Sequence, residues 1–468
     1  GSVTLTLSNI SDSGGSGYKN TKLPDGSYVT STSASYTATT NGTYTFVITD
    51  QAGNATTITF VVSNIDKSSP KVQFNPNGNE TYAKSHSTSV IVSDEGGSGM
   101  KEQKWAWSTS RTTEPSDWNN LNNGVSITTL GNTGTYYLWV KVSDQAGNSV
   151  TSVSNAFKVD TTEPTFRATP SDGIWKNTPY EVTPTIGDSH SGVDSSQVAW
   201  STSTTAPSVW ANYTGGTLKQ PGIGTYYLHY KITDKAGNIK QGYTGPYRYE
   251  NEAPKGTLVQ TPTDWTNKEV TLNVKDVTDS GGSGVKSIRL PNGNVVNGTS
   301  ASQVVSENGT YTFLLTDHAG NETTLTAIVN NIDKMTPNAK SNQYPIGWTN
   351  GDVTLSLTDI EDIGNSGYYR TLLPDGTYST AQTVTYKVNS NGEYRFIIYD
   401  RAGNQLTKSF QVSNIDKVKP QGTLTYSDTN PINHDVTITL KATDEGSGSN
   451  PFNCQTEPLS TVAPFPTQ

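Results

Sequence analysis

The chain has 468 residues, of which 31% are hydrophobic and 16% charged, and its formal net charge is −9. This length exceeds the ~100–150 residues of a usual domain, so several domains are expected. The acidic balance argues against nucleic acid as a partner, because phosphate binding needs clustered Lys and Arg. A single cysteine, Cys454, excludes internal disulfides. Because no long apolar run is present, we expect no membrane insertion in this fragment and place any signal peptide or anchor outside it.

From the N-terminus, the chain predicts one short strand after another. Residues 3–9 alternate in hydrophobicity and lead into a glycine-rich loop that begins at Asp12. Strands at 44–48 and 57–62 then flank the pentapeptide Asp-Gln-Ala-Gly-Asn at residues 50–54. We interpret the pentapeptide as a hairpin turn, in which Asp accepts backbone hydrogen bonds and Gly supplies a positive φ.

The hairpin pentapeptide recurs, which identifies the chain as a tandem repeat. Its glycines are Gly53, Gly147, Gly237, Gly320 and Gly403, spaced 83–94 residues apart. A Gly-X-Tyr element before each copy matches the tyrosine corner of immunoglobulin-like sandwiches, with Tyr44, Tyr136, Tyr226, Tyr311 and Tyr394. Two residues later, where a disulfide-bonded domain would have cysteine, the chain has Phe46, Leu138, Leu228, Phe313 and Phe396. Each repeat is therefore predicted to be one small β-sandwich.

The junctions between repeats define the predicted domain boundaries. Each junction has a carboxylate four residues before a proline, and these carboxylates are Asp66, Asp160, Glu250, Asp333 and Asp416. We predict repeats 1 to 6 at residues 1–66, 67–160, 161–250, 251–333, 334–416 and 417–468. Repeat 1 lacks its opening strand, repeats 2 and 3 form a tryptophan-containing subtype, and repeat 6 is incomplete and ends in an unpatterned tail. Short Pro-containing linkers predict an all-β tandem array of immunoglobulin-like β-sandwich domains that forms an extended, monomeric rod.

The hairpin motif, together with the Val-Asp-Thr-Thr-Glu-Pro junction at 159–164, resembles the bacterial immunoglobulin-like (Big-type) repeats of large surface adhesins and cell-wall proteins. The resemblance covers residue 1 to about residue 448. It implies a secreted or cell-surface bacterial protein whose repeats hold a binding module away from the cell. The implied partners are proteins or glycans of a host or neighbouring cell.

In some adhesin repeats of this type, aspartates at the junctions and in adjoining loops bind calcium. The resemblance therefore implies calcium between domains, held by the junction carboxylates and by two further sets. The hairpin set is Asp50, Asp144, Asp234, Asp317 and Asp400, and the glycine-rich loop set is Asp12, Asp94, Asp188, Asp279 and Asp362. Calcium takes about six to eight oxygen ligands, which carboxylates beside glycine-rich turns can supply. Against this, Lys67, Lys334 and Lys417 follow three of the junction carboxylates, and each aspartate could instead serve only its own turn.

Tryptophans are the candidates for contact with a ligand, because exposed aromatic rings stack on sugars. We single out Trp118, Trp210 and Trp139, the first two of which lie among loop residues. Core packing is the alternative role for tryptophan in these repeats, and it is expected for Trp105 and Trp107. Exposed Trp118 and Trp210 would favour carbohydrate-binding repeats that accompany a secreted glycan-active enzyme, and spacers of a phage or appendage fibre are a further alternative. No Ser/His/Asp constellation can be placed, so no enzymatic activity is predicted.

Overall fold

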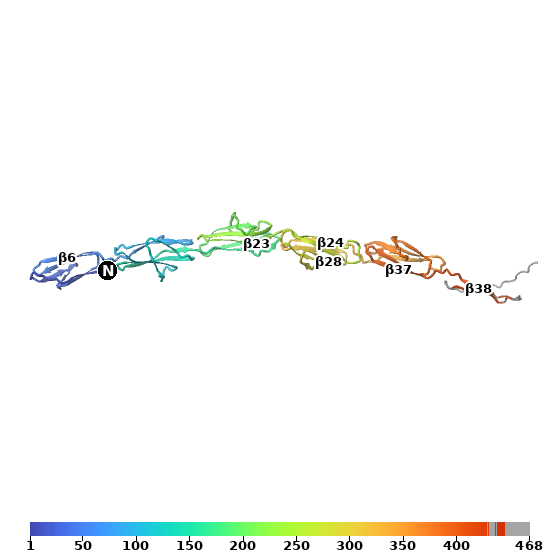
Figure 1. The fold of residues 1–468 in the computed structure, drawn as a ribbon, viewed down its shortest axis with the longest axis horizontal. Coiled ribbons are helices and arrows are strands. Elements are labelled where there is room, and N and C mark those ends of the chain that lie inside the picture. Colours follow the sequence, from blue (N-terminus) through green and yellow to red (C-terminus); the bar gives the residue numbers. More distant parts are fainter. Residues whose placement is uncertain (428, 430–435, 437, 445–468) are drawn as a thin grey trace, which may run out of the picture. The chain divides into compact units, whose positions relative to one another are not determined.

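The computed structural model describes residues 1–427, 429, 436 and 438–444, and the described chain is all-β (Figure 1). It divides into two compact units, Gly1–Ile174 with Pro179–Tyr249, and Trp175–Thr178 with Glu250–Gln468. Among the described residues, no helix has the length and apolar character needed to cross a membrane. Cys454 and the predicted tail lie outside the described residues.

The first unit contains repeats 1 to 3. The strands of repeat 1 are β1 (Val3–Leu7), β2 (Tyr18–Lys22), β3 (Tyr28–Val29), β4 (Ala34–Ala38), β5 (Gly42–Asp50) and β6 (Ala55–Val62). Those of repeat 2 are β7 (Lys71–Asn75), β8 (Asn79–Ala83), β9 (Ser87–Ser93), β10 (Met100–Ser108), β11 (Asn119–Asn120), β12 (Ser126–Thr128), β13 (Gly134–Asp144), β14 (Ser149–Val153) and β15 (Phe157–Val159). Those of repeat 3 in this unit are β16 (Thr165–Thr169), β18 (Glu181–Gly187), β19 (Val193–Ser201), β20 (Ala211–Asn212), β21 (Leu218–Lys219), β22 (Gly224–Asp234) and β23 (Ile239–Tyr249).

The second unit begins with β17 (Trp175–Lys176) and contains the later repeats. Repeat 4 consists of β24 (Lys255–Thr261), β25 (Val270–Thr278), β26 (Val285–Arg289), β27 (Val295–Val296), β28 (Ala301–Val305), β29 (Gly309–Asp317) and β30 (Glu322–Val329). Repeat 5 consists of β31 (Asn338–Tyr344), β32 (Val353–Glu361), β33 (Tyr368–Leu372), β34 (Tyr378–Ser379), β35 (Val384–Val388), β36 (Gly392–Asp400) and β37 (Gln405–Val412). The described strands of repeat 6 are β38 (Gln421–Tyr426) and β39 (Ile438–Thr443), which pair with each other.

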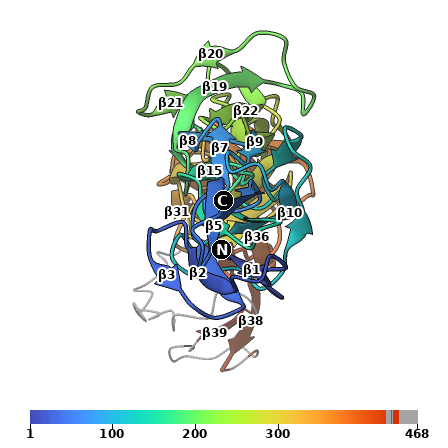
Figure 2. The same cartoon turned by 90° about the vertical axis from the view of Figure 1, so that its left-hand side faces the viewer.

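Repeats 4 and 5 show the immunoglobulin-like sandwich most completely. In repeat 5 a three-stranded sheet of order β31-β32-β35 accompanies a four-stranded sheet of order β34-β33-β36-β37, and repeat 4 has the same arrangement. Repeat 3 likewise pairs β16-β18-β21 in one sheet and β23-β22-β19-β20 in another, several strands of which are labelled in Figure 2. The chain is therefore a tandem series of β-sandwich domains, as the sequence predicts.

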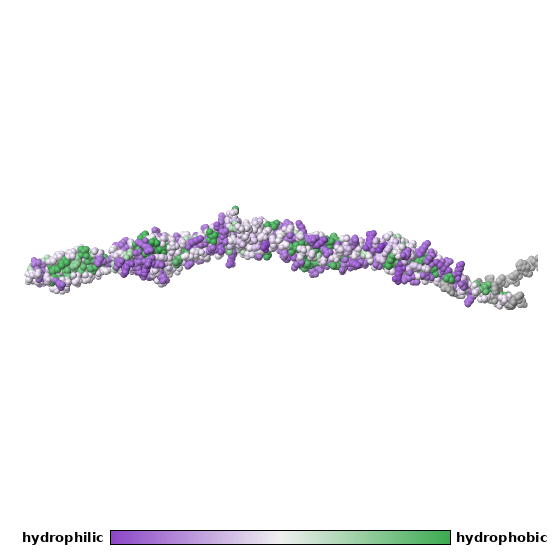
Figure 3. Space-filling view, in the orientation of Figure 1, coloured by the Kyte–Doolittle hydropathy of each residue, from purple (hydrophilic) through white to green (hydrophobic). Residues whose placement is uncertain are grey.

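The core of each repeat forms around the residue that replaces the disulfide cysteine. The five side chains at this position are all 0% exposed: Phe46, Leu138, Leu228, Phe313 and Phe396. Trp105 and Trp107 pack on the core of repeat 2, which confirms their predicted packing role. Trp200 packs on the core of repeat 3. Outward-facing positions are mostly polar, although apolar residues gather on the visible face of repeat 1 at the left of Figure 3.

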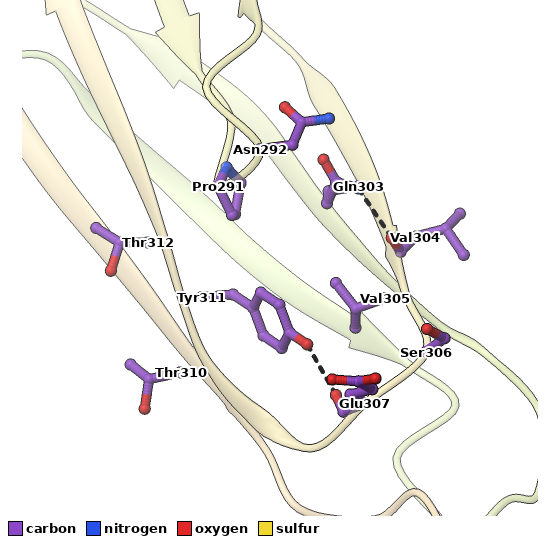
Figure 4. A pocket seen from close by; sticks show the side chains of 10 residues that line it. All are labelled: Pro291, Asn292, Gln303, Val304, Val305, Ser306, Glu307, Thr310, Tyr311 and Thr312. Carbon is purple, nitrogen blue, oxygen red and sulfur yellow. Dashed lines mark hydrogen bonds between the residues drawn. The ribbon is translucent and has the colours of Figure 1, made fainter.

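The tyrosine corner is present in four repeats. The hydroxyls of Tyr44, Tyr136, Tyr311 and Tyr394 each donate to the carbonyl four residues earlier, at 2.6–3.0 Å. Figure 4 shows this bond for Tyr311, whose hydroxyl points to Glu307 at the edge of a surface pocket. In that pocket Glu307 is the only carboxylate among the lining residues, so no acid and base pair is placed there.

The hairpin turns form as predicted. The five glycines of the pentapeptide have φ values between 88° and 95°. In every copy the backbone N–H of the final Asn donates to Oδ1 of the Asp at 2.8 Å. Turn chemistry in the sequence therefore determines this hairpin locally.

Candidate metal centres at the repeat junctions

Four groups of three carboxylates recur along the described chain. Each group combines a junction carboxylate with the loop aspartate and the hairpin aspartate of the following repeat. The groups are Asp66, Asp94 and Asp144; Asp160, Asp188 and Asp234; Glu250, Asp279 and Asp317; and Asp333, Asp362 and Asp400. In each group one oxygen of every residue lies within 4.8 Å of an oxygen of the other two. The structure thus brings together twelve of the carboxylates named from the sequence.

The remaining three candidates lie outside these groups. Asp12 accepts hydrogen bonds from the N–H groups of Gly14 and Gly17, while Asp50 serves its own hairpin. Asp416 accepts from the N–H of Val418, and most of the loop that follows its junction lies outside the described residues. None of these three carboxylates belongs to a group of three within the described residues.

Three junction aspartates, Asp66, Asp160 and Asp333, each join two repeats through their two oxygens. Oδ1 of Asp160 accepts from the N–H of Thr162 at 2.9 Å, within the junction. Oδ2 of Asp160 accepts from the N–H of Ser191 at 3.0 Å, in the loop of the next repeat. Asp333 repeats this pattern with Met335 and Ser366. The proline-containing junction is thereby fastened to the glycine-rich loop.

The hairpin asparagine fastens the junction from the other side. Asn238 Nδ2 donates to the carbonyl of Asp160 at 2.9 Å and to Oδ2 of Asp234 at 2.8 Å. Asn404 donates to the carbonyl of Asp333 at 2.9 Å in the same way. This role of the asparagine was not predicted from the sequence, although the recurrence of Asn in all five pentapeptides was an available signal.

Glycine in the loop leaves room for the junction carboxylate. A Cβ atom on Gly96 would lie 1.8 Å from Oδ1 of Asp66, and one on Gly364 would lie 2.1 Å from Oδ1 of Asp333. A Cβ atom on Gly281 would lie 2.0 Å from an oxygen of Glu250. These glycines are required by the approach of a carboxylate from another repeat, a second role that the sequence analysis did not identify.

The groups concentrate negative charge in buried positions. Asp144, Asp160, Glu250 and Asp317 are each 0% exposed. Two unit charges about 4 Å apart repel by about 4 kcal/mol at an effective dielectric constant near 20. No ion pair found among the described residues includes any of the twelve carboxylates. The groups therefore lack a cationic side chain that would balance them.

Lys334 and Lys417 do not neutralise the junction carboxylates beside them. Lys334 Nζ donates to the carbonyl of Ser306, and Lys417 Nζ donates to the carbonyl of Asn389, each at 2.7 Å. These contacts therefore do not support the expectation that the two lysines weaken cation binding at the junctions.

The protonation states differ among the groups. Burial acts to raise the pKa of Asp160, but hydrogen bonds from Ser191 and Thr162 outweigh it and lower that pKa. For Asp333, hydrogen bonds from Ser366 and Met335 likewise outweigh burial and lower the pKa. Burial, together with the neighbouring Asp317, raises the pKa of Glu250. The carboxyl groups of Asp160 and Asp333 are therefore ionised at neutral pH, whereas Glu250 holds a proton more readily.

The donor set fits a hard divalent cation. All the converging atoms are oxygens, which suit Ca²⁺ and Mg²⁺ rather than metals that prefer nitrogen or sulfur. Oδ2 of Asp188 is buried without a hydrogen-bond partner, whereas Oδ1 accepts from the backbone N–H groups of His190 and Gly192. A buried carboxylate oxygen without a partner is costly unless a cation contacts it.

The three candidate tryptophans contact their own domains. Trp139 is 7% exposed, and its Nε1 donates to the carbonyl of Ser110 at 2.9 Å. Trp118 is half-buried with Lys141 Nζ 5.9 Å from its ring centre. Trp210 is half-buried beside His229, at 6.5 Å between ring centres. Trp139 is therefore a packing residue, while Trp118 and Trp210 keep part of their rings in solvent.

No protein-family model matches the chain, and no curated protein matches it. Among solved structures, the chain is similar to fibronectin(III)-like modules of Clostridium thermocellum CbhA, with 13% identity, 38% of this chain and 95% of that chain covered, and a TM-score of 0.21. It is also similar to a 1.5-MDa bacterial ice-binding adhesin, with 17% identity, 57% and 99% coverage, and a TM-score of 0.27. It is similar as well to the FN1–FN3 domains of chicken CNTN1, with 12% identity, 56% of this chain and 98% of that chain covered, and a TM-score of 0.21. Because these TM-scores are low, the assignment to immunoglobulin-like all-β repeats rests on the strand order described above.

Proposed function

We propose that this chain is a non-enzymatic segment of a secreted or cell-surface bacterial protein, in which the repeats act as a spacer for a binding module. In this proposal the carboxylate groups bind calcium at successive junctions. The bound ions then hold neighbouring repeats in an extended, monomeric array that presents the module to a protein or glycan of another cell.

One observation supports the proposal most directly. The same three carboxylate positions converge at four junctions, and each group takes its members from both repeats that meet there. A cation bound to such a group has ligands on both sides of the linker. Binding would restrict the hinge, because bending the linker would pull ligands from the ion.

Thermal unfolding and solution scattering test the proposal together. We expect excess CaCl₂ to raise the melting temperature relative to EGTA, and to increase the maximum dimension toward roughly 200 Å, estimated from strand length. MgCl₂ at the same concentration is the control, because Mg²⁺ demands a smaller octahedral site and should act more weakly. Identical melting and scattering in CaCl₂ and EGTA would instead assign the aspartates to turn formation alone.

A further inference from the structure

A cationic, aromatic surface lies on repeat 5, on strands that carry none of the twelve grouped carboxylates except the hairpin aspartate Asp400. Arg370 lies on β33, opposite Tyr399 of the neighbouring strand β36. Its guanidinium carbon lies 3.9 Å from the ring centre of Tyr378, 4.9 Å from that of Tyr369 and 5.7 Å from that of Tyr399. We call these four residues the Arg370 patch.

The patch faces solvent rather than the core. The next residue, Thr371, is 0% exposed, and strand alternation therefore places Arg370 on the outer side of the sheet. Tyr369 and Tyr378 are 49% and 51% exposed. Two aromatic rings and one guanidinium are thus available on the same surface.

The hydrogen-bonding capacity of Arg370 is unused. Within the described residues its guanidinium has no carboxylate partner and donates no hydrogen bond, and its buried Nε is unpartnered. By contrast, Arg395 on the same sheet donates to both oxygens of Glu393. The guanidinium carbon lies over the ring of Tyr378, and the terminal nitrogens of Arg370, which donate no hydrogen bond within the described residues, are the donors for a ligand.

The sandwich itself does not require this arrangement. The position of Arg370 is occupied by Asn20 in repeat 1 and by Ser287 in repeat 4, as the shared strand register shows. Tyr28 of repeat 1 corresponds to Tyr378 but has no arginine beside it. These repeats provide matched surfaces of the same fold without the guanidinium.

We propose that the Arg370 patch binds an acidic sugar, whose carboxylate pairs with the guanidinium while its ring lies on an exposed tyrosine. The planar guanidinium matches a carboxylate through two parallel N–H donors. Tyrosine provides a large, rigid contact surface with few torsions to restrict. Uronic and sialic acids share the required chemistry of one carboxylate on a saccharide ring.

The single unpaired cation favours a sugar acid over an acidic peptide. A peptide with several carboxylates would meet one guanidinium on a chain whose formal net charge is −9. One carboxylate beside a saccharide ring instead matches one guanidinium beside exposed tyrosine rings. The inference concerns this patch alone and does not depend on calcium at the junctions.

Isothermal titration of the full chain tests the inference in EGTA and again in CaCl₂. The probes are hyaluronan oligosaccharides, which contain glucuronate, and oligosialic acid, with chitin oligosaccharides as the neutral control and oligo-glutamate as the peptide control. We expect at least one acidic saccharide to bind with the same affinity in both buffers. Whichever saccharide binds identifies the source of the carboxylate.

Variants test the assigned contacts. Arg370→Ser, which introduces the residue of repeat 4, should weaken binding at least tenfold, and Arg370→Lys should restore little because it lacks the planar fork. Tyr28→Ala should leave binding unchanged, and thermal unfolding checks that each variant is folded. The inference is overturned if neither acidic saccharide binds, if chitin oligosaccharides or oligo-glutamate bind equally well, or if Arg370→Ser binds like the parent chain.

Discussion

The junctions at Asp160 and Glu250 use the same three positions but differ in how their oxygens are occupied. At Asp160, the loop aspartate Asp188 keeps one buried oxygen without a partner. At Glu250, Oε1 accepts from Ser283 Oγ at 2.9 Å and Asn321 Nδ2 at 2.8 Å, while Oε2 accepts from the N–H of Glu252 at 2.8 Å. One additional methylene therefore brings the junction carboxylate within reach of Asn321 Nδ2, whereas the equivalent Asn238 donates to the backbone carbonyl of Asp160.

This difference indicates that the repeated junctions are not equivalent cation sites. An ionised group with a free oxygen gains more from a cation than a group whose oxygens already accept hydrogen bonds and whose pKa is raised. We therefore expect the strongest calcium binding at Asp160 and the weakest at Glu250.

The largest effect is expected from the loop aspartates. Asp188→Asn should remove one calcium from the stoichiometry measured by calorimetry, together with about 2.7 kcal/mol of calcium-dependent stability at a hundredfold excess over Kd. The matched variant Asp279→Asn should lose less. Asp25→Asn, in an exposed turn of repeat 1, is the control. Equal losses at Asp188 and Asp279 would remove the proposed distinction.

Substitutions of the loop glycines should distinguish a loop that a junction carboxylate approaches from a loop that none approaches. Gly96→Ala should destabilise the chain by about 1–3 kcal/mol, because its Cβ must displace Asp66. Gly14→Ala is the matched control, since the nearest atom, Oδ1 of Asp12, lies 3.2 Å from the added Cβ and no junction carboxylate approaches. Chemical denaturation of both variants measures the difference, and equal costs would show that the approach of Asp66 is unimportant.

Replacing Glu250 by the shorter aspartate should make the calcium affinity of its junction similar to that of the Asp160 junction. Glu250→Asp should increase calcium affinity at that junction about tenfold, or by about 1.4 kcal/mol, because the shorter carboxylate no longer accepts the hydrogen bond from Asn321 Nδ2. Calorimetry on the parent and variant chains measures the change. Unchanged or weaker binding would mean that the extra methylene does not limit the site.

The smallest expected effect is on the pH dependence of stability in calcium-free buffer, to which Glu250 and Asp160 should contribute with opposite signs. The raised pKa of Glu250 contributes stability below its ordinary value of 4.5, which is lost as pH rises through the raised pKa. The lowered pKa of Asp160 contributes stability above its ordinary value of 3.8, which is lost as pH falls through the lowered pKa. Denaturation of the parent chain, Glu250→Gln and Asp160→Asn over this range measures both contributions. Parallel pH profiles for the two variants would contradict the assignment.

Local patterns were sufficient to predict the sandwich. The alternating strand at β29, the buried Phe313 and the Asp317 turn each depend on neighbours along the chain, so their roles can be inferred from the sequence. The position of Trp139 could not be inferred in this way. Its burial depends on a carbonyl at Ser110, in a loop whose path is determined by packing.

The sequence by itself determined the repeat, its hydrophobic core positions and its turns, because these follow from hydrophobic period and backbone chemistry over a few residues. Only the tertiary structure decided which carboxylates meet, since Asp160, Asp188 and Asp234 lie on three separate segments. It also decided that Asn238 fastens the junction and that Arg370 lacks an ionic partner among the described residues. Long-range convergence and the absence of a partner arise from packing, which no local pattern encodes.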